Sequence, residues 1–107
     1  IKLRGFRAED EDGPAMGGFR IFRERCVRCH AINDEGGHVG PDLNVPRSIV
    51  EYRPADQIRA YVRNPATFRY GAMPAHPDLT EGDLDAMIAY FHAMAARKHD
   101  PRERADR

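Results

Sequence analysis

The apolar residues in the middle of the chain recur at helical spacing. In residues 15–26, Phe19, Phe22 and Cys26 are three and four positions apart, so they fall on one face of a helix. We therefore expect the first helix of the fold in this stretch.

A second helix is predicted to begin near Pro54, because proline is favourable in a first helical turn. It ends at Asn64, since Pro65 disfavours helical backbone at the residue before it. Its apolar face is formed by Ile58, Tyr61 and Val62.

The third and longest pattern begins at Thr80, a suitable N-cap, with Glu81 and Asp83 in the first turn. Its apolar stripe consists of Leu84, Met87, Ile88, Phe91, Met94 and Ala95. Glycine and proline separate the three patterns, and no stretch alternates with the period of a strand. The predicted fold class is therefore all-α.

Both ends of the chain are polar and lack an apolar period. Residues 1–14 are predicted to be a linker or an N-terminal extension, and residues 98–107 a flexible tail. One domain is expected between them, over residues 15–97. Because the chain starts at Ile1, we expect a processed product or a domain of a longer protein, and the absent signal peptide does not bear on the compartment.

The composition narrows the range of functions. Of the 107 residues, 17 are Lys or Arg and 17 are Asp or Glu, so the formal net charge is zero. This balance gives no support to nucleic-acid binding, and no apolar run approaches the roughly 20 residues of a membrane span. Hydrophobic residues make up 41% of the chain, which predicts a small core that a cofactor would stabilise.

Cys26 and Cys29 are the two cysteines, and His30 follows directly, which gives the attachment pattern of a c-type haem. Each thiol can add across a porphyrin vinyl group to form a thioether, and two cysteines at i and i+3 of a helical turn can reach adjacent vinyls. A histidine directly after the second cysteine can bind the iron as the proximal ligand. We therefore predict one haem c, held through two thioethers.

Two other interpretations of this pentapeptide stay open from the residues alone. The cysteines could be buried core thiols beside an unrelated histidine. They could also be half of a zinc site, with His38 as a further ligand.

Several separate motifs resemble the class I cytochrome c family over residues 18–96, in particular its small bacterial monohaem members. Gly18 and Phe22 precede Cys26 by eight and four residues, as in the family's N-terminal helix. The resemblance implies three to five helices around one haem, with the N- and C-terminal helices crossing at that glycine. The downstream motifs are Gly40-Pro41-Asp42-Leu43, Asn64-Pro65, Gly71-Ala72-Met73-Pro74 and Ala89-Tyr90-Phe91.

Met73 is the predicted sixth ligand of the iron. It lies in a loop between Gly71 and Pro74, in the order that the family uses, whereas Met87 and Met94 lie on the apolar stripe of the last helix. A neutral thioether favours Fe(II) and raises the reduction potential. The alternative ligand is His76 in the same loop, which would give a bis-histidine haem of lower potential.

Four further haem-binding residues are implied by the resemblance. In the family, the carbonyl of the residue matching Pro41 accepts a hydrogen bond from the proximal histidine and orients its ring. Leu43 is expected to pack against the porphyrin. Tyr61 and Asn64 match positions that often bond to a haem propionate or to the methionine loop.

The first predicted helix carries a cluster of basic residues, namely Arg20, Arg23, Arg25 and Arg28. If these side chains surround the exposed haem edge, they could steer an acidic partner. The alternative is an ordinary arginine-rich helix surface.

These features predict a periplasmic electron carrier rather than an enzyme, with Fe(III)/Fe(II) cycling between a redox donor and acceptor such as an oxidoreductase domain or subunit, a terminal oxidase or another cytochrome. The stretch 44–54 is similar to a subset that stands beside, or is fused to, a periplasmic oxidoreductase, so a relay domain within a larger enzyme is an alternative. A haem sensor or peroxidase-like domain with a displaceable sixth ligand is a further one.

Overall fold

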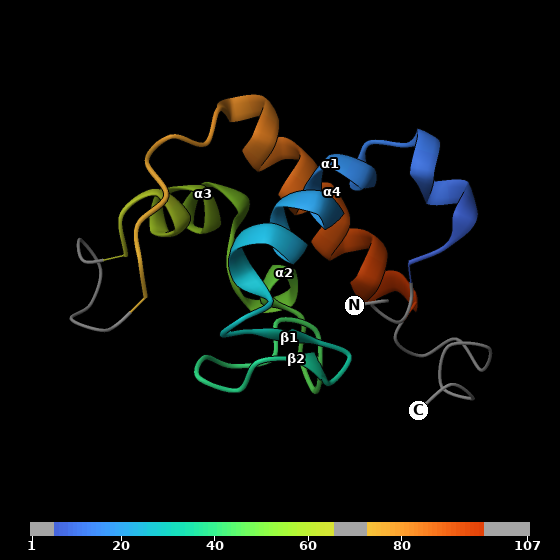
Figure 1. Cartoon of the computed structure of the whole chain (residues 1–107), viewed down its shortest axis with the longest axis horizontal. Helices are drawn as coiled ribbons and strands as arrows, with labels where there is room; N and C mark the ends of the chain where they lie inside the picture. Colours follow the sequence, from blue (N-terminus) through green and yellow to red (C-terminus); the bar gives the residue numbers. More distant parts are fainter. Residues whose placement is uncertain (1–5, 66–72, 98–107) are drawn as a thin grey trace.

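The computed structural model describes residues 6–65 and 73–97, and four α-helices dominate this part of the chain (Figure 1). Two short helices of other types and a minimal hairpin complete it. In chain order the elements are η1 (Ala8–Asp12), α1 (Ala15–Ile21), η2 (Phe22–Cys26), β1 (Ala31–Ile32), β2 (Glu35–Gly36), α2 (Ile49–Tyr52), α3 (Ala55–Arg63) and α4 (Glu81–Arg97).

The first predicted helix is confirmed, and its last turn has an unusual form. After α1 the chain continues through η2 as a π-helix, in which the Val27 amide donates to the Phe22 carbonyl at 2.9 Å. Single π turns are rare and occur frequently at functional sites. This one ends at Cys26, the first cysteine of the attachment motif.

The other two predicted helices are also confirmed, with the expected ends. Pro54 precedes α3, and the Asn64 amide closes it by donating to the Ala60 carbonyl at 3.1 Å. At the start of α4, the Thr80 hydroxyl accepts from the Asp83 amide and the Asp83 carboxylate accepts from the Thr80 amide, both at 3.0 Å. This reciprocal cap satisfies two amides of the first turn.

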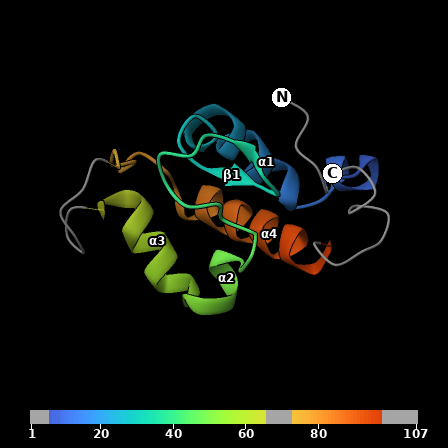
Figure 2. The same ribbon diagram turned by 90° about the horizontal axis from the view of Figure 1, so that it is seen from below.

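The N-terminal helix and α4 pack directly on each other, because Gly18 presents no side chain to α4. A β-carbon at Gly18 would stand 2.1 Å from the Ala86 carbonyl oxygen. Figure 2 shows α4 between α1 with the hairpin on one side and α2 with α3 on the other. The longest helix is therefore the centre of the fold.

Aromatic rings fill the contact between these helices. The Tyr90 ring lies 5.8 Å from that of Phe19 and 5.7 Å from that of Phe22, between ring centroids. Phe22 also meets Phe91 edge to face at 6.4 Å. Tyr90 and Phe22 are completely buried, so this cluster is the main apolar core.

The structure contains two local elements that the sequence analysis did not predict, the helix α2 and the hairpin β1–β2. The short helix α2 begins with a capping box, in which the Glu51 carboxylate accepts from the Ser48 amide at 2.7 Å and the Ser48 hydroxyl accepts from the Val50 amide at 3.3 Å. The pattern Ser-x-x-Glu is a known signal for such a start. The hairpin β1–β2 turns through Asn33 and Asp34, both with positive φ (52° and 67°), and these residue types tolerate that conformation.

The N-terminal residues from Phe6 onward are docked on the helical domain rather than extended away from it. The Phe6 ring stacks on Phe19 with 4.1 Å between centroids and 11° between planes. Asp10 in η1 forms a two-point ion pair with Arg97 at the end of α4, with 2.8 Å between Arg97 Nη2 and Asp10 Oδ1. The domain bounds, and whether residues 1–14 act as a linker or an extension, stay predictions.

No helix in the described ranges is both long and apolar enough to cross a membrane. Residues 1–5, 66–72 and 98–107 lie outside the description. They include Gly71 of the predicted methionine motif and the predicted tail.

Candidate functional site

The backbone brings the two cysteines and the histidine onto one helical turn. The Cys26 carbonyl accepts hydrogen bonds from the Cys29 amide at 3.1 Å and from the His30 amide at 2.9 Å. Residues three and four positions apart lie on the same side of such a turn. A single planar ligand could therefore meet both thiols and the imidazole.

The loop after the hairpin folds back over this turn. Its amides donate to carbonyls of the motif, from Gly37 to Val27 and from Gly40 to Cys29, both at 2.7 Å. A β-carbon at Gly37 would stand 2.0 Å from the Arg28 carbonyl oxygen. Glycine is therefore required for the loop to come this close to the attachment turn.

The ring of His30 is oriented by a hydrogen bond to this loop. Its Nδ1 lies 2.8 Å from the carbonyl oxygen of Pro41. A carbonyl can only accept, so Nδ1 carries the proton and Nε2 of the neutral ring has a free lone pair. This is the tautomer that a histidine needs in order to bind a metal through Nε2.

The backbone of Gly40 packs closely against the same ring. A β-carbon at Gly40 would lie 2.3 Å from His30 Cε1 and 2.7 Å from Nδ1. The imidazole is thus held between backbone on one side and the Pro41 carbonyl at its edge. This backbone restraint keeps Nε2 in one direction.

Three residues that the sequence analysis did not single out fix the loop itself. The Asp42 carboxylate accepts from the amides of Asp34, Asn44 and Val45 at 2.8, 2.8 and 2.9 Å. The buried Asn44 amide group donates to Asn33 Oδ1 at 2.6 Å and to the Met94 carbonyl at 3.0 Å. Asp42, directly after Gly40-Pro41, is the sequence signal for such a turn contact.

Both cysteines are half-buried free thiols. Burial raises the pKa of the Cys26 thiol to about 11, so at neutral pH this sulfur keeps its proton. Redox-active Cys-x-x-Cys pairs instead depend on a thiol with a lowered pKa. The arrangement therefore suits an attachment or structural role better than thiol–disulfide exchange.

Met73 and His76 lie together in the segment that leads into α4, and both side chains are half-buried. The His76 amide donates to the Val62 carbonyl of α3 at 3.0 Å. Burial lowers the pKa of the His76 imidazole, with a further contribution from the charge of Arg25. The choice between Met73 and His76 as the sixth ligand stays a prediction.

The remaining predicted site residues lie on different elements. Leu43 is half-buried and packs against the central core. Tyr61 is half-buried on α3, and Asn64 is exposed at the end of that helix. Their contacts to a haem remain predictions.

The basic cluster on the first helix is not uniform. All four arginines are exposed, but Arg23 lies over the Phe19 ring at 5.3 Å and Arg25 forms a two-point ion pair with Asp78. The positive charge of Arg25 is therefore largely balanced by a neighbour. Arg20 and Arg28 better suit the predicted steering surface.

The alternative of a zinc site has no geometric support. Within the described ranges, no group of three or more His, Cys, Asp or Glu residues comes together as a metal cage. His38, the suggested further ligand, is exposed.

Comparisons with known proteins are consistent with this geometry. The family model described as cytochrome c oxidase, cbb3-type, subunit III matches residues 13–91. Cytochrome c oxidase subunit 2 of Alkalihalophilus pseudofirmus is 31% identical over 103 residues, covering 86% of this chain. The similar region is 30% of that relative's length, so the chain spans less than a third of it. No solved structure matches.

Proposed function

We propose that this chain, which belongs to the c-type cytochrome family of the cbb3-type cytochrome c oxidase subunit III, carries one haem c on Cys26 and Cys29, with His30 and Met73 as axial ligands. Domains of this family transfer electrons and are not enzymes by themselves. The proposal adds the covalent attachment and the ligand set to that general function.

The observation that carries the proposal is the contact between His30 and Pro41. The 2.8 Å bond from Nδ1 to the Pro41 carbonyl leaves Nε2 as the free donor atom, and Gly40 holds the ring from behind. A carbonyl partner of this kind also fixes the ring orientation that a ligating histidine needs. The residues present therefore fit a haem whose iron is bound by His30.

A bound haem c supplies an iron that cycles between Fe(III) and Fe(II). The chain's own residues decide how that centre behaves. Cys26 and Cys29 would hold the group covalently, and His30 would bind its iron. Met73 would supply a neutral sulfur as the second iron ligand, which would keep out external ligands. We take α1 and α4, which meet at Gly18, as the crossing pair of a cytochrome c fold.

We further propose that the domain is an electron relay for a terminal oxidase, on the outer side of the bacterial cytoplasmic membrane. Support comes from the oxidase names of both the family model and the relative, and from the small share of the relative that the chain spans. The donor and the acceptor would be other redox domains or subunits.

Covalent attachment is tested by denaturing gel electrophoresis and mass spectrometry of the purified protein. We expect one haem to stay with the chain after denaturation, with no free thiol. A colourless protein in which Cys26 and Cys29 react fully with a thiol reagent would contradict the proposal.

The ligand set is tested by the absorption spectrum of the oxidised protein. A methionine sulfur on ferric haem gives a weak charge-transfer band at the red end of the visible range, and Met73→Ala should abolish it and admit carbon monoxide to the reduced protein. His76→Ala is the control, since it lies in the same segment and should leave the band intact. If the His76 variant loses the native spectrum and the Met73 variant keeps it, the haem is bis-histidine.

A further inference from the structure

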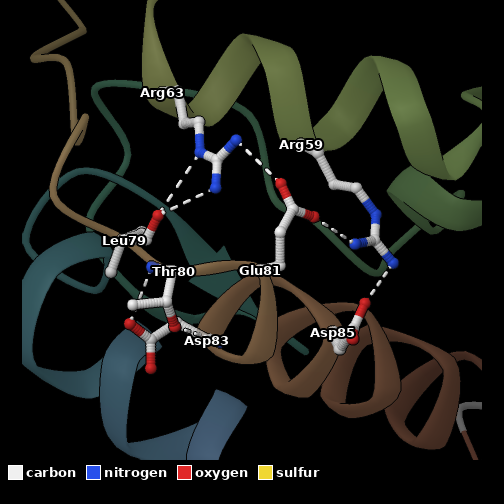
Figure 3. A network of polar contacts seen from close by, with 7 residues as sticks. All are labelled: Arg59, Arg63, Leu79, Thr80, Glu81, Asp83 and Asp85. Carbon is white, nitrogen blue, oxygen red and sulfur yellow. Dashed lines mark hydrogen bonds and ion pairs between the residues drawn. The ribbon is translucent and has the colours of Figure 1, made fainter.

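The segment from Met73 to Thr80 contains no helix or strand in the described ranges, so its position depends on a few specific contacts. Two of them come from α3. The His76 amide donates to the Val62 carbonyl at 3.0 Å, and the Arg63 guanidinium donates to the Leu79 carbonyl at 3.1 and 3.3 Å (Figure 3). One side of the segment is thereby tied to α3.

The other side is tied to the helix that carries the cysteines. Arg25 Nη1 lies 2.8 Å from Asp78 Oδ1, and Nη2 lies 2.6 Å from Oδ2. This parallel two-point geometry is the strong form of an arginine–carboxylate pair. Arg25 directly precedes Cys26, so the contact joins the attachment turn to the segment of the predicted sixth ligand across 53 positions of sequence.

We infer that the Arg25–Asp78 ion pair is a latch that holds the Met73 segment against the attachment helix and thereby controls how often the sixth coordination position opens. The inference rests on the proposed ligation by His30 and Met73. Arg25 and Asp78 act as positioning residues, because neither is expected to touch the iron.

The short chain between the latch and the ligand supports this role. Asp78 is five residues after Met73, and five extended residues span at most about 18 Å. Release of this contact removes the tie between the segment and the attachment helix, while the hydrogen bonds to α3 and the buried Leu79 side chain stay in place.

The expected effect is modest, since the pair is partly exposed to solvent. The side chain of Arg25 is 34% exposed and that of Asp78 62% exposed. Exposed ion pairs of this kind change a local equilibrium by about two- to fivefold. If opening of the sixth coordination position limits the rate at which an external ligand binds, that rate should change by the same factor.

The chain offers a closely matched control. Arg59 of α3 pairs with Asp85 of α4, and these side chains are 29% and 62% exposed (Figure 3). This second pair joins two helices and does not involve the segment from Met73 to Thr80. Asp85→Asn therefore removes a similar charge contact from a place where no effect on the sixth ligand is expected.

The test compares Asp78→Asn and Asp85→Asn with the wild-type holoprotein. Two quantities are measured: the rate at which carbon monoxide binds to the reduced protein, and the hydrogen-exchange rate of the His76 amide. We expect Asp78→Asn to increase both by about two- to fivefold and Asp85→Asn to change neither. Adding Arg25→Gln to Asp78→Asn should give no further increase, because the pair acts as a unit.

The outcomes separate this inference from the proposed function. A wild-type protein without the methionine charge-transfer band overturns the ligation and, with it, the role of the latch. If the band is present but the two variants bind carbon monoxide and exchange the His76 amide at the same rates, the ligation stands and the latch is overturned. Additive effects of Arg25→Gln and Asp78→Asn would likewise overturn it.

Discussion

Gly18 of α1 and Ala86 of α4 lie so close that a β-carbon on Gly18 would stand 2.1 Å from the Ala86 carbonyl oxygen. Backbone atoms on a long helix cannot give way as a flexible side chain can. We expect Gly18→Ala to push the helices apart and to lower the free energy of unfolding by about 1–3 kcal/mol. Denaturant titration followed by far-ultraviolet circular dichroism measures this loss.

Gly82→Ala is the control for that substitution, because a β-carbon there would meet its nearest neighbour, Thr80 Oγ1, at an ordinary 3.7 Å. Replacing a helical glycine with alanine under these conditions stabilises by about 0.5–1 kcal/mol. Equal destabilisation by both variants would show that the α1–α4 contact is not the cause.

The ion pair between Asp10 and Arg97 is expected to stabilise the docked N-terminal extension. The side chains are 10% and 18% exposed, and Arg97→Gln should lower the free energy of unfolding by about 1.5–3 kcal/mol at pH 7. Arg59→Gln, which removes two more exposed ion pairs, to Glu81 and Asp85, should cost less. Equilibrium unfolding of the two variants gives the comparison.

The same pair predicts a dependence on pH. The hydrogen bond from Arg97 holds the pKa of the Asp10 carboxyl below its ordinary value of 3.8. A lowered pKa in the folded state means that the stabilisation is complete above the unfolded pKa and is lost as the pH falls below it. The difference in stability between wild type and Arg97→Gln should therefore be constant from pH 7 to about 5 and shrink below about 4. A difference that grows on acidification would contradict this assignment.

Gly40 supports the His30 ring, and a β-carbon there would lie 2.3 Å from His30 Cε1. Gly40→Ala should displace the imidazole from the Pro41 carbonyl, at a cost of about 1–3 kcal/mol, and reduce the fraction of chains that mature with haem. The ratio of haem absorbance to protein measures that fraction. His38→Ala, at an exposed position of the same loop, should mature normally, and a normal yield of the Gly40 variant would argue against the ring restraint.

Met94 is completely buried near the C-terminal end of α4, unlike the half-buried Met73. Met94→Ala should leave the methionine charge-transfer band in place and lower the free energy of unfolding by about 2–5 kcal/mol. The spectrum and an unfolding curve of the same sample separate the two effects. Loss of the band in a folded Met94 variant would place the ligand in the last helix instead.

The resemblance to c-type cytochromes was readable from the sequence and is confirmed by the family to which the chain belongs. The three main helices could be predicted from the sequence because helix period, caps and proline stops are each encoded within a few neighbouring residues. Thr80 and Asp83 cap α4, and Asn64 ends α3 before Pro65, as their types predict. The attachment motif is equally local, because hydrogen bonds from the Cys29 and His30 amides to the Cys26 carbonyl place these three residues on one turn.

The contacts that position the site were decided by the tertiary structure. Arg25 is one of many arginines, and nothing in its neighbourhood along the chain indicates a partner 53 residues away at Asp78. Asp10 lies in an acidic run near the N-terminus, and such a run predicts solvent-exposed side chains. Asp10 nevertheless pairs with Arg97, which is 87 positions away in the sequence. Such pairings depend on where helices come to lie once their apolar faces are buried. The sequence alone therefore determined the three main helices and predicted the attachment chemistry, while packing around α4 determined which charges meet.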